Sequence, residues 1–142
     1  MATGNRKAAA AISSVAGFSG NPCGVIGGVW IMGRVKTGML VGAAVRLASA
    51  ELIDCVVVNR GDADAGALFV HIDALDGRHK LLSRVIGFEG AYEWRSVLGD
   101  GVDSWTDAAA VSQRLARERD IDPDIWIIAI ADRAGRNPFA ML

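Results

Sequence analysis

The stretch that decides the fold is residues 122–136, DPDIWIIAIADRAGR. Its seven apolar residues, 125–131, show no alternation with polar side chains and are too few for an ordinary core helix or a membrane span. They predict a strand that is covered on both faces and is therefore central in its sheet. Pro123 prevents a helix at the entrance because it lacks a backbone N–H, and Gly135 permits a tight turn at the exit. Residues 136–141 are then predicted to return as an edge strand, where Pro138 is tolerated.

The composition is that of one globular domain with an uneven distribution of charge. Of 142 residues, 51% are apolar and 22% are charged, which is typical of a folded domain. Residues 1–38 carry four basic side chains and no acid, whereas residues 39–142 carry eleven basic and sixteen acidic side chains, a net charge of −5. Because an acidic domain repels phosphate, the composition disfavours nucleic-acid binding.

The N-terminal 38 residues differ from the remainder, and the chain is divided into two parts. Residues 1–38 are predicted to be a low-complexity extension, disordered or weakly helical, and residues 39–142 a single domain. One alternative is a targeting segment with Arg6 and Lys7 as its basic region, although Ser13 interrupts the apolar core. Another is a misassigned start, with the initiator at Met32 or Met39. The two cysteines, Cys23 and Cys55, form no CxxC pair, which favours a reducing, cytoplasmic location.

The order of predicted elements favours an α+β domain. Strands are predicted at residues 40–47, 53–58, 67–73, 79–86 and 92–98, with a loop over 59–66 and a hairpin turn at Asp76-Gly77. One main helix is predicted over residues 105–119, because Ser104 and Asp107 have the spacing of a capping box. The strand at 125–131 then re-enters the sheet. The prediction is an antiparallel meander of about five to six strands with one main helix packed on it.

Two paired motifs carry a resemblance to a known family. The first is Arg60-Gly61-Asp62 with Gly66, and the second is Asp122-Pro123-Asp124-x-Trp126 followed by Asp132-Arg133-x-Gly135-Arg136, with Trp94 between them. In this order they resemble the short alphaproteobacterial proteins known as domain of unknown function 1491, over residues 40–139. The resemblance implies no activity, cofactor or substrate. The family pattern typically has acidic residues where this chain has Ala129 and Ala131.

Arginines at strand ends and turns are the main candidates for a binding site, since arginine outnumbers lysine by twelve to three. If they converge, they would form a bidentate anion site. The hypothesis assigns ligand binding to Arg60, Asp62, Asp64, Arg84, Arg133 and Arg136. Secondary candidates are Asp122, Asp124, Arg114 and Arg117, as acid–base groups or as an ion-paired junction between helix and strand.

The remaining polar clusters predict neither a metal nor a cofactor. The Asp62 and Asp64 loop lacks the further oxygens of a calcium loop, so its carboxylates are expected to cap backbone amides. His71 and His79 are expected to be cross-strand neighbours, and two ligands do not make a zinc site. Cys55 is expected to be a small buried hydrophobe.

The leading functional hypothesis is a non-catalytic binding or adaptor domain with an arginine-lined anion site. Its partner would be another protein or a small anionic ligand. The alternatives are a small enzyme that acts on an anionic or phosphorylated substrate with aspartate acid–base groups, and an RNA-binding module. An enzyme requires a carboxylate and an arginine within reach of one point. An adaptor requires an exposed apolar patch or sheet edge.

Overall fold

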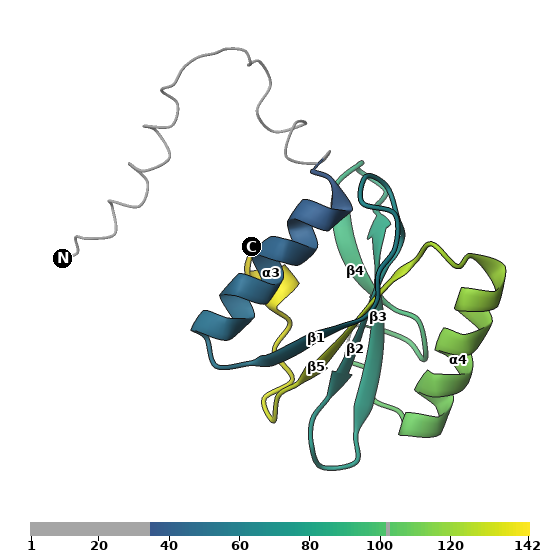
Figure 1. The fold of residues 1–142 in the computed structure, drawn as a ribbon. Coiled ribbons are helices and arrows are strands. Elements are labelled where there is room, and N and C mark those ends of the chain that lie inside the picture. The colour runs from purple at the N-terminus through teal and green to yellow at the C-terminus, as the bar shows by residue number, and fades with distance from the viewer. Residues whose placement is uncertain (1–34, 102) are drawn as a thin grey trace. The chain divides into compact units, whose positions relative to one another are not determined.

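The computed structural model describes residues 35–101 and 103–142 (Figure 1). The compact unit spans Lys36–Leu142. Its elements are α3 (Thr37–Ala50), β1 (Asp54–Asn59), β2 (Leu68–Asp73), β3 (His79–Ile86), β4 (Tyr92–Ser96), α4 (Ala108–Ile121), β5 (Trp126–Ala131) and the 3₁₀ helix η1 (Pro138–Met141). The predictions for residues 1–34 lie outside the described residues. Neither α3 nor α4 is long and apolar enough to cross a membrane.

The five strands form one mixed sheet in the order β1-β5-β2-β3-β4. The predicted strand at 125–131 is confirmed as β5, which lies between two neighbours and buries Ile128 and Ile130 almost completely. The prediction of a purely antiparallel meander is wrong, because β5 pairs antiparallel with β1 but parallel with β2. A parallel neighbour requires a crossover connection, and the segment that contains α4 supplies it.

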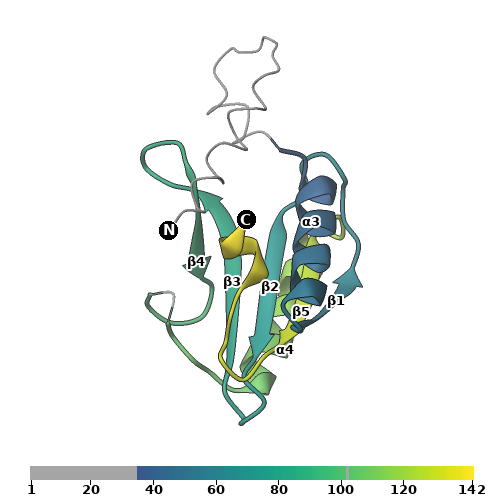
Figure 2. The ribbon, with the colours of Figure 1, turned by 90° about the vertical axis from the view of Figure 1, so that its left-hand side faces the viewer.

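Helices cover both faces of the sheet (Figures 1 and 2). On one face α3 and Phe139 of η1 pack on strand side chains that include Val70 and Ile128. On the other face Val111 and Leu115 of α4 pack on Phe69, Leu81 and Ile127. Because successive residues of a strand point to opposite faces, the continuous apolar run of β5 supplies both halves of the core.

The strand predicted at residues 40–47 is wrong, since this segment lies within helix α3. The buried positions of α3 are Thr37, Val41, Ala44 and Ala48. Their spacing of three to four residues is that of one face of a helix. The small alanines let the helix lie close to the sheet. The helix begins two residues before the predicted start of the domain at residue 39.

The predicted return strand at residues 136–141 is also wrong. Residues 138–141 form the 3₁₀ helix η1, whose N-cap Asn137 accepts a hydrogen bond from the N–H of Phe139. Pro138 occupies the first helical position, where a missing N–H costs nothing. The Asn-Pro pair is therefore a helix start, and η1 buries Phe139 in the core.

The predicted main helix is confirmed as α4, but it starts later than predicted. Asp107 is the N-cap, and its Oδ1 accepts a hydrogen bond from the N–H of Ala110 at 2.8 Å. Ser104 is outside the helix, where its hydroxyl donates to the carbonyl oxygen of Asp100. Trp105 lies beside Lys80, whose Nζ is 4.2 Å from the ring centroid.

The other predicted strands and the Asp76-Gly77 hairpin are confirmed within one or two residues of their bounds.

Candidate functional site

The predicted ligand-binding residues are divided between the two ends of the sheet. In the β1–β5 pair, Asp54 lies opposite Ala131 and Asn59 opposite Ile127. The loop that begins at Arg60 therefore lies at the N-terminal end of β5, whereas Arg133 and Arg136 follow its C-terminal end. The six residues of β5 span about 20 Å, so the sheet separates these arginines.

The loop at residues 59–66 and the entrance to β5 form one junction. The N–H of Asp62 donates to the carbonyl oxygen of Asp124 at 3.0 Å, and the indole Nε1 of Trp126 donates to the carbonyl oxygen of Asp62 at 2.8 Å. A Cβ at Gly61 would overlap the carbonyl oxygen of Asp124, so the close approach requires glycine. The two motifs that carry the family resemblance are thus in direct contact at this junction.

The carboxylates of this loop have partners within the chain. Oδ2 of Asp62 accepts a hydrogen bond from the N–H of Ala65 at 2.8 Å, as a turn cap does. Asp64 forms an exposed ion pair with Lys36 at 3.1 Å. Oδ1 of Asp122 accepts from the N–H of Asp124 at 3.0 Å. The carboxylates of Asp62 and Asp122 thus accept hydrogen bonds from backbone N–H groups of their own turns.

The arginines have separate partners. Cζ of Arg60 lies 5.6 Å from the ring centroid of Trp126, and Cζ of Arg84 lies 3.6 Å from that of Tyr92. Partial burial lowers the pKa of Arg84. Arg136 binds Asp132, with 2.8 Å between Nη2 and Oδ1, and this hydrogen-bonded pairing lowers the pKa of Asp132.

The structure shows no hydrogen bond or ion pair between the secondary candidates on α4 and those at the entrance to β5. Nε of Arg114 lies 2.6 Å from Oε1 of Glu118, an ordinary pair at a spacing of four residues. Arg117 and Asp124 are exposed. A pocket of about 350 Å³ does lie between the C-terminal part of α4 and the end of β1, but its lining residues were not predicted as site residues. They are Asn59, Ala116, Arg119, Asp120 and Pro123.

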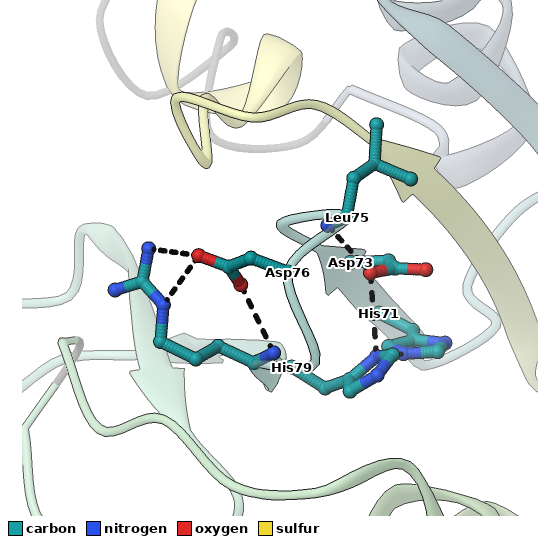
Figure 3. Close-up of polar contacts among 6 residues, drawn as sticks. His71, Asp73, Leu75, Asp76 and His79 are labelled. Carbon is teal, nitrogen blue, oxygen red and sulfur yellow. Dashed lines mark hydrogen bonds and ion pairs between the residues drawn. The ribbon is translucent and has the colours of Figure 1, made fainter.

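The two histidines form a hydrogen-bonded pair across β2 and β3, as expected (Figure 3). Nε2 of His71 lies 3.0 Å from Nδ1 of His79, and Oδ1 of Asp73 lies 3.8 Å from the same Nδ1. Burial lowers the pKa of His71, and the nearby His79 lowers it further. Among the described residues, no group of three or more His, Cys, Asp or Glu side chains has a geometry that could hold a metal ion.

Ala129 and Ala131, at which the resemblance implies acidic residues, lie beside this pair. Ala129 is the β5 neighbour of His71, and Ala131 is the β5 neighbour of Asp73. Acidic side chains at these positions would face the imidazoles and favour their protonated forms. In this chain the alanines leave Asp73 as the carboxylate that raises the pKa of His71.

The edge strand β1 exposes three large apolar side chains. It pairs with β5 and has no strand on its other side in the described part of the chain. Val56 is 60% exposed and Val58 is 57% exposed, with Val57 also on the surface. Leu52, just before the strand, is exposed as well. Sequence reasoning missed this surface because an apolar run predicts burial. Among the described residues, β1 therefore has both an exposed apolar surface and a free sheet edge.

The comparisons with known proteins give a family and a fold. Residues 35–140 match the family described as "Protein of unknown function (DUF1491)". A crystal structure of a DUF1491 family protein from Caulobacter crescentus is 31% identical, with a TM-score of 0.64, covering 72% of this chain and 92% of that chain. The solution structure of protein Atu0922 from A. tumefaciens is 25% identical, with a TM-score of 0.57, covering 69% and 86% of the two chains. No functionally curated protein matches.

Proposed function

This chain belongs to the DUF1491 family of proteins of unknown function, and we propose that it is a non-catalytic binding domain that recognises another protein chain at the free edge of β1. The observation that carries the proposal is that β1 combines exposed valines with a strand edge that no other strand of residues 35–101 and 103–142 pairs with. An edge strand presents backbone N–H and C=O groups to which an extended chain can add.

The side chains of β1 favour such an addition. The strand is Asp-Cys-Val-Val-Val-Asn, with its single charge at Asp54. Edge strands that must remain unpaired are usually protected by charges, proline or bulges. Here the register shift between Val57 and Asn59 protects the C-terminal part. The part from Asp54 to Val57 is regular and open.

The loop after β1 extends the proposed surface. Arg60 follows the strand directly, and the Asp62–Gly66 segment is held by hydrogen bonds to the β5 entrance. A chain added to β1 would end beside Arg60, Asp62 and Asp64. We propose that these residues contact the partner, and that the guanidinium of Arg60 binds a carboxylate of the partner.

The positions of the carboxylates support binding over catalysis. An acid–base mechanism needs a carboxylate and an arginine around one point. Asp62 and Asp122 instead accept hydrogen bonds from the backbone, and Arg136 pairs with Asp132 at the other end of β5. The net charge of −5 over residues 39–142 disfavours RNA. The cytoplasmic location remains a proposal from the cysteine pattern.

The test is affinity capture from a lysate of the host with three forms of the full chain. The wild type and Ile86→Lys should retain the same bound protein, and Val56→Lys should lose it. Ile86 is a matched control because it is 65% exposed and lies at the end of β3. Circular dichroism should show that all three forms are folded. If Val56→Lys captures the partner as well as the wild type does, the β1 edge is not the binding surface.

A further inference from the structure

We infer that the chain added to β1 is a second copy of this protein, paired through β1 about a two-fold axis. The inference rests on the proposed function, because it names the occupant of the same edge. A two-fold interface uses the same surface patch on both copies. The patch must therefore be complementary to itself, in strand direction, side-chain pairing, charge and the surfaces beside it.

Strand direction and register meet this requirement. A two-fold axis normal to the sheet makes the two β1 strands antiparallel and keeps each face of the sheet on the same side. Opposed residues then share a face, so the pair is centred on a residue. The regular segment before the register shift runs from Asp54 to Val57. Centring on Val56 places it opposite Val56 of the second copy, and Cys55 opposite Val57 of the second copy.

Those side-chain pairs are apolar on both faces. Val56 is the most exposed side chain of the regular segment among the large apolar residues. Its neighbour in β5 is the small Ala129, so no bulky side chain covers it from that side. Cys55 is half-buried, and burial raises the pKa of its thiol, so it remains an uncharged apolar group. Valine pairs across antiparallel strands stabilise a sheet.

Charge does not oppose this arrangement. Asp54 is the single charge of β1, and Arg60 follows the opposite end of the strand. Antiparallel pairing places the two Asp54 side chains about 13 Å apart along the seam. Each Asp54 then lies toward the end at which Arg60 of the second copy follows. At this separation the repulsion between the two carboxylates is small, because solvent and salt screen it.

Helix α3 distinguishes a second copy from a simple peptide strand. One of its fourteen residues, Arg46, is charged, yet one stripe of it is buried and Met39 is 67% exposed. The exposed side of α3 thus carries a single charge, whereas the outer face of a surface helix is normally rich in polar and charged residues. Figure 2 shows α3 on the side of the sheet that ends in β1, and the two elements are in contact.

The two-fold axis places both copies of α3 on the same face, side by side across the seam. A peptide strand would cover the edge of β1 and leave α3 as it is. A second copy would bring a strand to β1 and a helix to α3 in one step. The product is a continuous ten-stranded sheet whose outer edges are the two β4 strands.

The first experiment measures the mass of the full chain in solution by sedimentation equilibrium. We expect a dimer at tens of micromolar protein. Val56→Lys should shift the equilibrium to the monomer, with dissociation at least tenfold easier, since the two lysines would face one another at the centre. Ile86→Lys should remain a dimer. A wild type that is monomeric at all accessible concentrations would overturn the inference, as would a Val56→Lys dimer of wild-type strength.

The second experiment tests whether the two Val56 positions are opposite one another, and it introduces no charged residue. In a Cys23→Ser, Cys55→Ala background, Val56→Cys should form a disulfide-linked dimer under mild oxidation, because opposed residues bring their Cβ atoms close. Ile86→Cys is the control and should remain monomeric on a non-reducing gel. Equal cross-linking of the two variants would contradict pairing at β1.

These outcomes separate the inference from the proposed function. A monomeric wild type whose captured partner is lost in Val56→Lys would refute the second copy and retain the β1 edge as a binding surface. Dimers that persist in Val56→Lys, together with retained capture, would refute both.

Discussion

The two edge strands of the sheet, β1 and β4, are built differently. Within the residues that the structure describes, each has a single neighbouring strand. In β4 the charged side chains of Glu93 and Arg95 are exposed and form an ion pair at 2.5 Å, whereas β1 exposes Val56 and Val58. Trp94 between the two charges packs against Phe139, with 5.5 Å between ring centroids.

The difference shows how each edge is used. Exposed charges on an edge strand oppose the addition of another strand. β4 therefore closes the sheet, and its inward tryptophan anchors it to the core. The exposed valines of β1 contribute little to folding of the single chain, because they remain in water. Exposed valines lower solubility, and their presence is explained if β1 pairs with a strand of another chain.

The largest expected effect is on the free energy of unfolding, where we compare the inward side chain Trp94 of β4 with the outward side chain Val56 of β1. Trp94→Ala should lower the free energy of unfolding by about 3 kcal/mol, because it removes the ring that contacts Phe139. Val56→Ala should change the stability of the monomer by less than about 0.5 kcal/mol, since its side chain is exposed. Urea unfolding at low protein concentration measures both. Equal losses would mean that β1 serves the fold as much as β4 does.

A smaller effect is expected where α3 is attached to the loop after β1. Thr37 is buried, and its hydroxyl donates to the carbonyl oxygen of Gly66 at 3.1 Å. Thr37→Val keeps the shape but leaves this oxygen without that donor, and should cost about 1 kcal/mol. Ser49→Ala, at an exposed position of the same helix, is the control. Urea midpoints that are the same for both variants would show that the hydrogen bond does not hold α3.

The stability contributed by the central strand β2 is expected to depend on pH through His71. The folded-state pKa of His71 is lowered below the ordinary value of 6.5. As pH falls below 6.5, the unfolded chain takes up a proton that folded His71 resists, so stability decreases until the pH reaches the folded-state pKa. Asp132, whose pKa is lowered from 3.8, loses its contribution below that value and outside this window.

The expected result is a urea midpoint that is lower at pH 5 than at pH 7.5, with a smaller difference in His71→Gln. The loss should be less than that of Thr37→Val, because Asp73 partly opposes the lowering. A variant with the pH dependence of the wild type would show that His71 is not the responsible group.

The smallest effect on stability is expected at the charged pair of β4. Replacing Glu93 and Arg95 together by valine should change the free energy of unfolding by less than about 0.5 kcal/mol, since an exposed ion pair contributes little. The same change makes the β4 edge resemble β1. We therefore expect new self-association, seen as increased light scattering with protein concentration. If the double variant scatters no more than the wild type, the charges of β4 do not protect the edge.

Local patterns were sufficient to predict most strands and the loop between β1 and β2. The run at 125–131, the Asp76-Gly77 turn and the motif glycines specify conformations that depend on few neighbours. The same reasoning failed for α3, because residues 40–47 are apolar throughout and a strand and a buried helix then look alike. The spacing of Thr37, Val41, Ala44 and Ala48 carried the helical signal.

The candidate surface was less predictable than the fold. The sequence places arginines and aspartates at strand ends, but only the register shows which ends meet. Asp62 meets Asp124 across 62 residues of chain, and Arg60 is far from Arg136 because β5 lies between them. The exposure of β1 depends on which strands become its neighbours, and no local pattern contains that information.

The sequence by itself determined that residues 125–131 form a buried strand, that Asp76-Gly77 is a hairpin turn and that α4 follows the meander. These features arise from backbone preferences and apolar patterns within a few residues. The tertiary structure alone decided that β5 inserts between β1 and β2, which makes the sheet mixed and leaves β1 at the edge. The physical reason is that pairing between strands distant in the chain is selected by burial of the whole core, to which helices on both faces contribute.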